Sequence, residues 1–460
     1  MTTMLQLQDL ALDSTTRGNP WWCGLFTTLL LTLLGCAHEG GPDLNVDLER
    51  QRGRNALLSG RPDWARHHYG RVVEHREDDL EAWRRLGQAW GQGQEGGLSR
   101  AIEAYERALA LGPSEPDEVE IRLGMARSWH RLGDPGRALA VLPPGGDPRI
   151  AVLRARCLLD RDPEAAWRAI DSALTTTSKG LDAAERAEHH RLAAEVAFRR
   201  DDPDLALDHV RRAVDLDPLE PGIHFLASRV HRRLGDAEAT TAALGRFQTL
   251  QRIAGAESVE PPAPAERLAL LRGLQPELPD AFPVRQRLAL LTLEVEGRPE
   301  ALSALETVRD DPAQTAPGLL ALAQAAQRRG WVLEALDLYR AVLDKRPEQA
   351  VALSQGAVLA AELGESETAD RWLDHALAAD PDRSLFHAAR GRVLLQRDDG
   401  AGAETSLRRA VELAPWEVAD RLLLAELLMA RGDREGTTRL LDEAPAAEAA
   451  LTAYRRKHSL

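Results

Sequence analysis

Histidine and cysteine side chains are the groups of this sequence that could hold a metal ion or act as a nucleophile. The two clusters that come nearest to a metal site are His67, His68, Glu74 and His75, and His189 and His190 with Glu195. Neither cluster has the ligand spacing of a zinc or other transition-metal site. We therefore interpret them as solvated polar positions on helices, and we expect no metal site.

The other residues with possible chemistry are better explained as core residues. Cys157 lies among Ala155, Leu158 and Leu159, and this apolar setting favours a small buried thiol over a reactive one. Four tryptophans are interpreted as core anchors in the same way: Trp83, Trp90, Trp129 and Trp167.

Known catalytic motifs are absent from the sequence. It has no Gly-x-Ser-x-Gly elbow, no phosphate-binding loop, no His-Glu-x-x-His motif and no Cys-x-x-Cys pair. We predict that the protein is not an enzyme and uses no cofactor. The substrate-recognition half of an enzyme is a less favoured alternative, because the repeats described below leave no room for a catalytic domain.

One cysteine near the start of the chain carries a different signal. The apolar residues 21–34 follow Arg17 and end in Leu33-Leu34-Gly35-Cys36, a run too short to span a bilayer comfortably but suited to the core of a signal peptide. This ending resembles the lipobox of bacterial lipoprotein precursors, in which the cysteine is acylated and becomes the first residue. The resemblance implies a signal peptide at 1–35, lipidation at Cys36 and a tether at 36–45.

Two details qualify this interpretation. The segment before Arg17 is long and acidic, which favours a true start at Met4 or later. Ala37 follows the cysteine, and by resemblance to enteric sorting rules this implies an outer-membrane lipid anchor facing the periplasm. The alternative is a cytoplasmic regulatory or adaptor module in which the apolar run is not a signal.

The composition favours an all-α chain. Apolar residues make up 44% of the 460 positions but aromatic residues only 4%, so the β-branched and aromatic runs that strands need are scarce. The length exceeds one ordinary domain and indicates several domains or a repeat array. The net charge of -14 repels phosphate backbones, so we expect no nucleic-acid partner.

A 34-residue period organises the C-terminal half of the sequence. Three kinds of position recur at this spacing: small residues at Ala335, Ala369, Ala403 and Thr437, turn signals at Gly330, Gly364, Asp398 and Gly432, and prolines at Pro347, Pro381 and Pro415. This pattern resembles the tetratricopeptide repeat, a helix-turn-helix unit in which small residues let paired helices approach and a proline ends each unit.

The N-terminal half shows the same signature with more drift. Its clearest copy contains Trp83, Leu86, Gly87, Trp90, Ala101, Tyr105, Ala108 and Pro113, with a two-residue insertion in the turn at 91–99. Apolar residues spaced by three and four give each helix one stripe, which is buried only when neighbouring helix pairs stack.

The resemblance implies an all-α, right-handed superhelical solenoid of about ten TPR-type helix-turn-helix repeats. The proline-rich stretch at 251–265 reads as a linker, which allows two blocks. We therefore predict an N-terminal block at 46–250, a C-terminal block at 266–445 and a capping helix at 446–460.

In tetratricopeptide arrays the first helix of each unit lines the partner-binding groove, and the resemblance carries this role to sixteen positions. In the N-terminal block they are Arg50, Arg54, Arg84, Gln88, Arg127, His130, Arg191, Arg229 and Arg232. In the C-terminal block they are Leu320, Gln324, Val351, Val358, Leu385, Leu422 and Met429.

The two sets differ in chemistry and imply different partners. Guanidinium groups pair with carboxylates, so the first set indicates an acidic or C-terminal carboxylate peptide, and the second indicates an apolar helix or extended segment. The open alternatives are that the arginines are solvated or paired within the array, and that the apolar positions are buried by repeat packing or by a second copy.

The prediction for function is a membrane-tethered protein-protein interaction scaffold. Tethered proteins that resemble this one assist assembly of envelope machines such as a pilus, a secretion apparatus, an outer-membrane assembly complex or a polysaccharide exporter. Fold-level analogy does not choose among these machines, and the sequence leaves the oligomeric state open.

Overall fold

The computed structural model describes residues 44–93, 95–145, 147–176, 181–255, 262–278, 282–444 and 449–458. The predicted signal peptide and Cys36 lie outside these residues, so both stay predictions. No helix of the described part combines the length and the apolar character needed to cross a membrane. The contacts within the chain group into two compact units, of which the first ends at Glu49 and the second begins at Arg50. Every contact reported below lies within the second unit.

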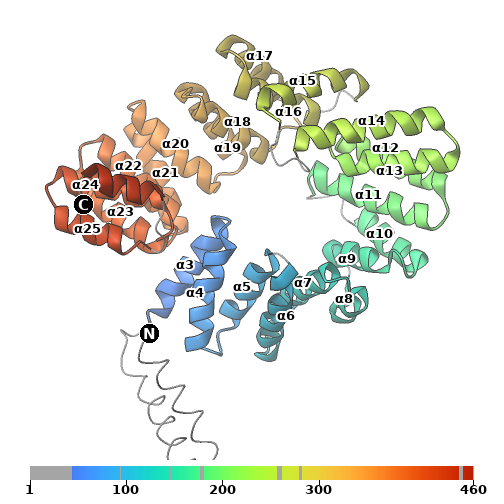
Figure 1. Cartoon of the computed structure of the whole chain (residues 1–460), viewed down its shortest axis with the longest axis horizontal. Helices are drawn as coiled ribbons and strands as arrows, with labels where there is room; N and C mark the ends of the chain where they lie inside the picture. Colours follow the sequence, from blue (N-terminus) through green and yellow to red (C-terminus); the bar gives the residue numbers. More distant parts are fainter. Residues whose placement is uncertain are drawn as a thin grey trace, which may run out of the picture. The chain divides into compact units, whose positions relative to one another are not determined.

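Helices form this part of the chain, and the described residues contain no strand, which confirms the all-α prediction (Figure 1). In the N-terminal block they are α3 (Val46–Leu58), α4 (Pro62–His75), α5 (Leu80–Gly91), α6 (Glu95–Ala110), α7 (Glu115–Arg131), α8 (Pro135–Val141), α9 (Pro148–Leu158), α10 (Pro163–Thr176), α11 (Ala183–Arg199), α12 (Pro203–Leu216), α13 (Pro221–Leu234) and α14 (Ala237–Ala254).

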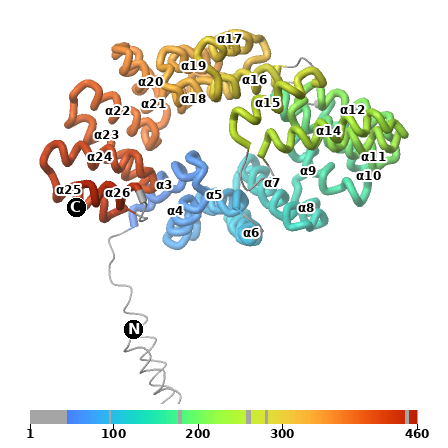
Figure 2. Tube along the Cα trace, turned by 45° about the horizontal axis from the view of Figure 1, so that its top comes forward, coloured from blue at the N-terminus to red at the C-terminus, as the bar shows by residue number. Residues whose placement is uncertain are grey.

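The chain continues through α15 (Pro264–Leu274) and the 3-10 turn η1 (Gln275–Glu277). The helices after them are α16 (Phe282–Val295), α17 (Arg298–Arg309), α18 (Ala316–Arg328), α19 (Val332–Lys345), α20 (Ala350–Glu362), α21 (Ser366–Ala379), α22 (Ser384–Gln396), α23 (Gly400–Leu413), α24 (Val418–Ala430), α25 (Arg434–Asp442) and α26 (Ala449–His458). Consecutive helices pack as pairs, and each pair packs on the next, which is the arrangement the period predicts (Figure 2).

The turn inside each pair has a repeated backbone conformation. Gly330, Gly364, Asp398 and Gly432, the predicted turn positions, all have positive φ angles of 72°, 82°, 61° and 80°. Glycine adopts this left-handed conformation without strain, and aspartate tolerates it better than most residues. An aspartate then caps several second helices, for example Asp399, which accepts a hydrogen bond from the Gly402 amide.

Glycine also lets aromatic side chains enter the space between helices. A Cβ at Gly87 of α5 would lie 2.7 Å from the Tyr105 ring, and one at Gly124 of α7 would lie 2.6 Å from it. The Tyr105 ring, which belongs to α6, therefore fills the space between the first helices α5 and α7. In the C-terminal block Trp372 packs in the same way on Gly356.

The apolar core differs between the blocks. In the C-terminal block a large cluster of buried residues extends from Ala289 to Val393, and smaller separate clusters lie beside it, such as the one from Leu407 to Tyr454. Clusters described in the N-terminal block are smaller than the large one, such as the one from Ala101 to Met125 and the one from Ala151 to Val196. Cys157 is 2% exposed within such a cluster, which confirms its prediction as a core residue.

Candidate functional site

All sixteen predicted groove residues lie in first helices of the pairs. The N-terminal set is carried by α3, α5, α7, α11 and α13, and the C-terminal set by α18, α20, α22 and α24. The helical placement is therefore as predicted. Their role in binding a partner remains a prediction.

Arg54, Arg84 and Arg127 lie on the successive first helices α3, α5 and α7, near the buried tyrosines Tyr69 of α4 and Tyr105 of α6. Burial raises the pKa of each tyrosine to about 12, and the arginine charges oppose that rise. We call Arg54, Arg84 and Arg127 the arginine row.

Many predicted groove arginines have acidic partners inside the chain. Arg50 contacts Asp79 with 2.5 Å between Nη2 and Oδ2, and Arg84 pairs with Glu81 of its own helix. Arg54 pairs with Asp380, where Nη2 lies 2.7 Å from Oδ2, and Arg191 pairs with Glu188, where Nε lies 2.6 Å from Oε2. This pairing is the alternative that the sequence left open, and it reduces the number of cations available to a peptide.

The remaining members of the N-terminal set have different surroundings. Arg127 and Arg232 are exposed, and within the described part of the chain neither makes an ion pair. Arg229 lies over the Phe198 ring at 4.8 Å, and the Gln88 Oε1 atom accepts a hydrogen bond from Arg85. The His130 Nδ1 atom lies 3.7 Å from the Cys157 sulfur, and burial lowers the pKa of this histidine.

The C-terminal set consists of half-buried residues. Leu320 and Val358 pack on the large cluster, Leu385 packs beside Phe386, and Leu422 packs on the last cluster. Val351 lines a pocket of about 560 Å³, whose other residues include Lys345, Arg346 and Arg383. Gln324 and Met429 are also half-buried.

The histidine clusters are less exposed than the sequence indicated. His68 is only 3% exposed, stacks on Trp64 and makes a tilted contact with Trp416, so its interpretation as a solvated position is wrong. His190 is half-buried, and its Nδ1 atom lies 3.0 Å from Nδ1 of His209. Three or more potential metal ligands do not gather anywhere in the described residues.

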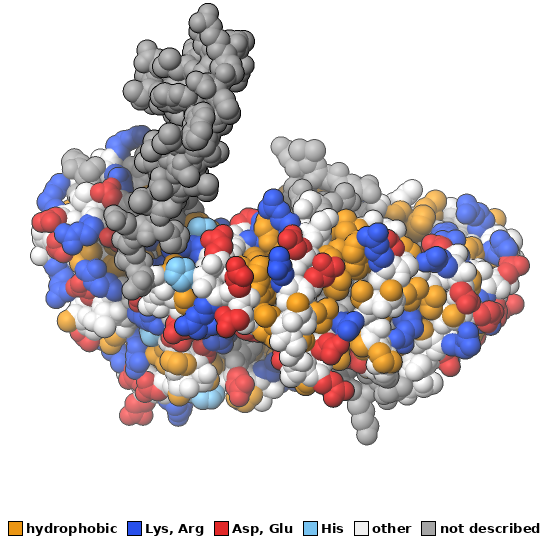
Figure 3. Space-filling model, turned by 90° about the horizontal axis from the view of Figure 1, so that it is seen from below, with side chains coloured by type: hydrophobic (Ala, Val, Ile, Leu, Met, Phe, Trp, Pro, Cys, Tyr) orange, Lys and Arg blue, Asp and Glu red, His pale blue; other side chains and the backbone are white. Residues whose placement is uncertain are grey.

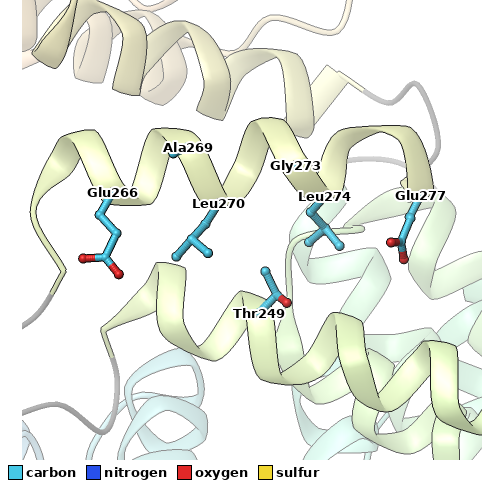
Figure 4. Close-up of a pocket in the computed structure, with 7 residues that line it drawn as sticks. All are labelled: Thr249, Glu266, Ala269, Leu270, Gly273, Leu274 and Glu277. Carbon is cyan, nitrogen blue, oxygen red and sulfur yellow. The ribbon is translucent and has the colours of Figure 1, made fainter.

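A further pocket of about 390 Å³ lies between α14 and α15. Figure 4 shows Leu270 and Leu274 pointing from α15 toward Thr249 of α14, with Glu266 and Glu277 at the two ends of the row. It contains no predicted groove residue. Over the face seen in Figure 3, acidic and basic side chains are interspersed with apolar ones, without a large region of one charge.

Sequence reasoning missed several residues that matter here. Asn55 is 2% exposed and Trp416 is 3% exposed, and neither was singled out. The burial of Asn55 could not be predicted from the sequence, because it is one polar residue among many on an amphipathic helix.

Comparison with known proteins identifies the repeat. A family model described as tetratricopeptide repeat matches residues 91–142 and 191–246. No curated protein matches the chain.

Several solved structures are similar in arrangement but distant in sequence. They include the Cut9–Hcn1 hetero-tetramer of the APC/C (13% identity, 90% of this chain and 96% of that chain, TM-score 0.33) and yeast Tom70 (14%, 90% and 94%, TM-score 0.35). A third is MamA from Desulfovibrio magneticus RS-1 (16%, 46% and 97%, TM-score 0.27). At these TM-scores the similarities carry no argument about function. The chain therefore contains tetratricopeptide repeats, within an all-helical array of helix pairs.

Proposed function

We propose that the protein is a membrane-tethered scaffold that binds other proteins and assists assembly of an envelope multiprotein complex. The observation that carries the protein-binding part is the arginine row. Its members lie on successive first helices, and Arg127 is exposed and makes no ion pair among the described residues. The proposed partner of this row is an acidic segment or a C-terminal carboxylate.

The proposed tether is an acylated Cys36 in the outer membrane, with the array in the periplasm. The lipobox pattern supports it, and the proposed tether at 36–45 would let the array reach a machine in the same envelope. The C-terminal apolar positions, which are half-buried, are proposed to take an apolar segment at their exposed edges.

Charge reversal tests the arginine row. In the Arg84→Glu, Arg127→Glu double variant we expect capture of native partners to fall by about tenfold or more, as loss of charge-assisted pairs implies. Arg211→Glu is the matched control, because Arg211 is an exposed arginine on the second helix α12. Unchanged capture by the double variant would refute the row as a binding site.

Comparison of wild type with Cys36→Ala tests the tether. Crosslinking in native cells, followed by affinity capture and mass spectrometry, should find wild type in membranes with a few envelope proteins and the variant without them. If both forms are soluble with the same cytoplasmic partners, the tethered scaffold is wrong and the cytoplasmic adaptor is the better account.

A further inference from the structure

The first helix pair contacts the last repeats of the array, far away along the chain. Asn55 of α3 is 329 residues from Ser384 of α22, and Arg54 is 326 residues from Asp380. In Figures 1 and 2 the blue α3 lies beside the red and orange helices of the C-terminal repeats. No contact of this kind follows from the stacking of neighbouring repeats.

Asn55 is satisfied mainly by this distant loop. Its Oδ1 atom accepts hydrogen bonds from the Ser384 amide at 3.0 Å and from the Ser384 hydroxyl at 3.1 Å. Its Nδ2 donates to the carbonyl of Asp382 at 2.8 Å and to that of Gln51 at 2.9 Å. Ser384 begins α22, where backbone amides lack intrahelical acceptors. The preceding Arg383 supplies no side-chain cap, so Asn55 supplies one from another repeat.

Ion pairs and aromatic rings surround this cap. Arg54 donates two parallel hydrogen bonds to the Asp380 carboxylate, at 2.9 Å and 2.7 Å. Arg52 donates to the Glu412 carbonyl at 2.8 Å. The Trp64 ring of α4 stacks on Trp416, with 5.8 Å between centroids and 23° between planes.

The repeat period explains why the pair of α3 and α4 contacts the loops after α21 and α23 and not the equivalent loop after α19. The loops at 380–384 and 414–418 are copies of the loop at 346–350, shifted by 34 and 68 residues. The position of Asp380 is taken by Arg346 in the earlier copy and by Ala414 in the later one. Arg346 would repel Arg54, so the charge at this single position selects the repeat on which the hairpin docks.

We propose that α3 and α4 form a reversible latch on the loops after α21 and α23, with Arg54, Asn55 and Trp64 as its main contacts. The interface consists of hydrogen bonds, one paired arginine and the aromatic contacts of Trp64 and His68 with Trp416. Neighbouring repeats instead share buried alanine, leucine and tyrosine cores. The latch therefore opens without unfolding the array, and opening frees the carboxylate of Asp380 and uncovers Trp416. This surface would suit a basic amphipathic helix of a partner when the hairpin has left it.

Hydrogen exchange at the Ser384 amide tests the latch in the full-length protein, with no partner needed. Because this amide has no intrahelical acceptor, its protection reports the Asn55 contact. We expect Asn55→Ala and Arg54→Glu each to accelerate exchange at Ser384 by about tenfold or more. Amides in the middle of α5 and α22 should keep their protection, which shows that both ends remain folded.

Charge exchange supplies the decisive control. Arg54→Glu combined with Asp380→Arg should restore protection of Ser384, whereas Arg84→Glu, an arginine of the same row with its own acidic partner, should leave it unchanged. Fast exchange at Ser384 in wild type, or no response to Arg54→Glu, would overturn the latch. Protection that depends on protein concentration would also overturn it, because the contact would then join two copies.

Discussion

The two blocks of this protein use the same helix pair but repeat it with different regularity. In the C-terminal block the first helices begin at Ala316, Ala350, Ser384 and Val418, each 34 residues after the last. In the N-terminal block they begin at Leu80, Glu115, Pro148, Ala183 and Pro221, with spacings that vary. The strict period accompanies one large apolar cluster from Ala289 to Val393, with separate clusters such as the one from Leu407 to Tyr454 beside it. The drifting period accompanies smaller clusters.

This difference indicates what a regular repeat contributes physically. When every helix pair has the same orientation relative to its neighbour, the apolar stripe of each pair packs against the stripe of the next, and the apolar core extends along the array. An insertion or deletion rotates a pair relative to its neighbour, and polar contacts then fill the mismatch. Ion pairs between helices occur in both blocks, for example Arg156 with Glu188 and Arg298 with Glu334. We therefore expect the blocks to differ in the cooperativity of their apolar cores and not in the charge at their helix contacts.

The largest expected effect comes from removing a central tyrosine of each block. Tyr339→Ala empties a fully buried position and breaks the hydrogen bond from its hydroxyl to Gln327, so we expect a loss of about 3–5 kcal/mol. Hydrogen exchange should accelerate from α16 to α22, because one core joins these helices. In Tyr105→Ala the acceleration should stay within α5 to α7.

Exposed Leu333 provides the control, since Leu333→Ala should change exchange little. If Tyr105→Ala accelerates exchange as widely as Tyr339→Ala does, the contrast in cooperativity between the blocks is wrong.

A smaller effect concerns the acid sensitivity of the N-terminal block. Burial, with the nearby charge of His209 next in size, holds the pKa of His190 at about 4, below its ordinary 6.5. The folded state therefore binds fewer protons than the unfolded state between these values, and stability is lost as the pH falls from 6.5 toward 4. In His190→Gln, the free energy of unfolding should fall by about 1–2 kcal/mol less than in wild type when the pH is lowered through this range.

Urea unfolding at pH 7 and pH 5, followed by circular dichroism, measures this change. His75→Gln is the control, because His75 is exposed at the end of α4. An equal acid loss in wild type and in His190→Gln would exclude the histidine pair as its cause.

The smallest effect tests whether the turns of the two blocks are equivalent. Gly235 and Gly364 have φ angles of 80° and 82°. Gly235→Ala and Gly364→Ala should therefore each lower the free energy of unfolding by about 1 kcal/mol. Gly273→Ala should instead stabilise by about 0.5–1 kcal/mol, because Gly273 is an exposed position inside α15 with free space around it. Thermal unfolding of the three variants checks this, and unequal costs at the two turns would show that the turns differ.

Much of this fold could be predicted from the sequence, because its information is local and repeated. The turn at Asp398 was predicted from the period alone, and its positive φ angle confirms it. The burial of Cys157 followed from its neighbours. The binding role of Arg84 and Arg127 was also predicted, and it stays a prediction because no partner is present.

What could not be predicted depends on residues far apart in the chain. His68 was expected in solvent because Trp64 is the one large side chain close to it in the sequence that covers it, and the second ring, Trp416, comes from the last repeats. Arg54 was assigned to a groove, but its carboxylate partner Asp380 lies on the other block. A period fixes which residues share a helix face, and it contains no information about contacts between the ends of an array.

The cap that Asn55 supplies to Ser384 also affects the order in which the chain folds. Extensive helix contacts in the described residues join near neighbours, so folding can start at any pair and spread along the array at low contact order. The contact across 329 residues can form only when both terminal repeats are already structured. It is therefore expected to be a late step that leaves the folding rate unchanged and slows the first opening of the ends.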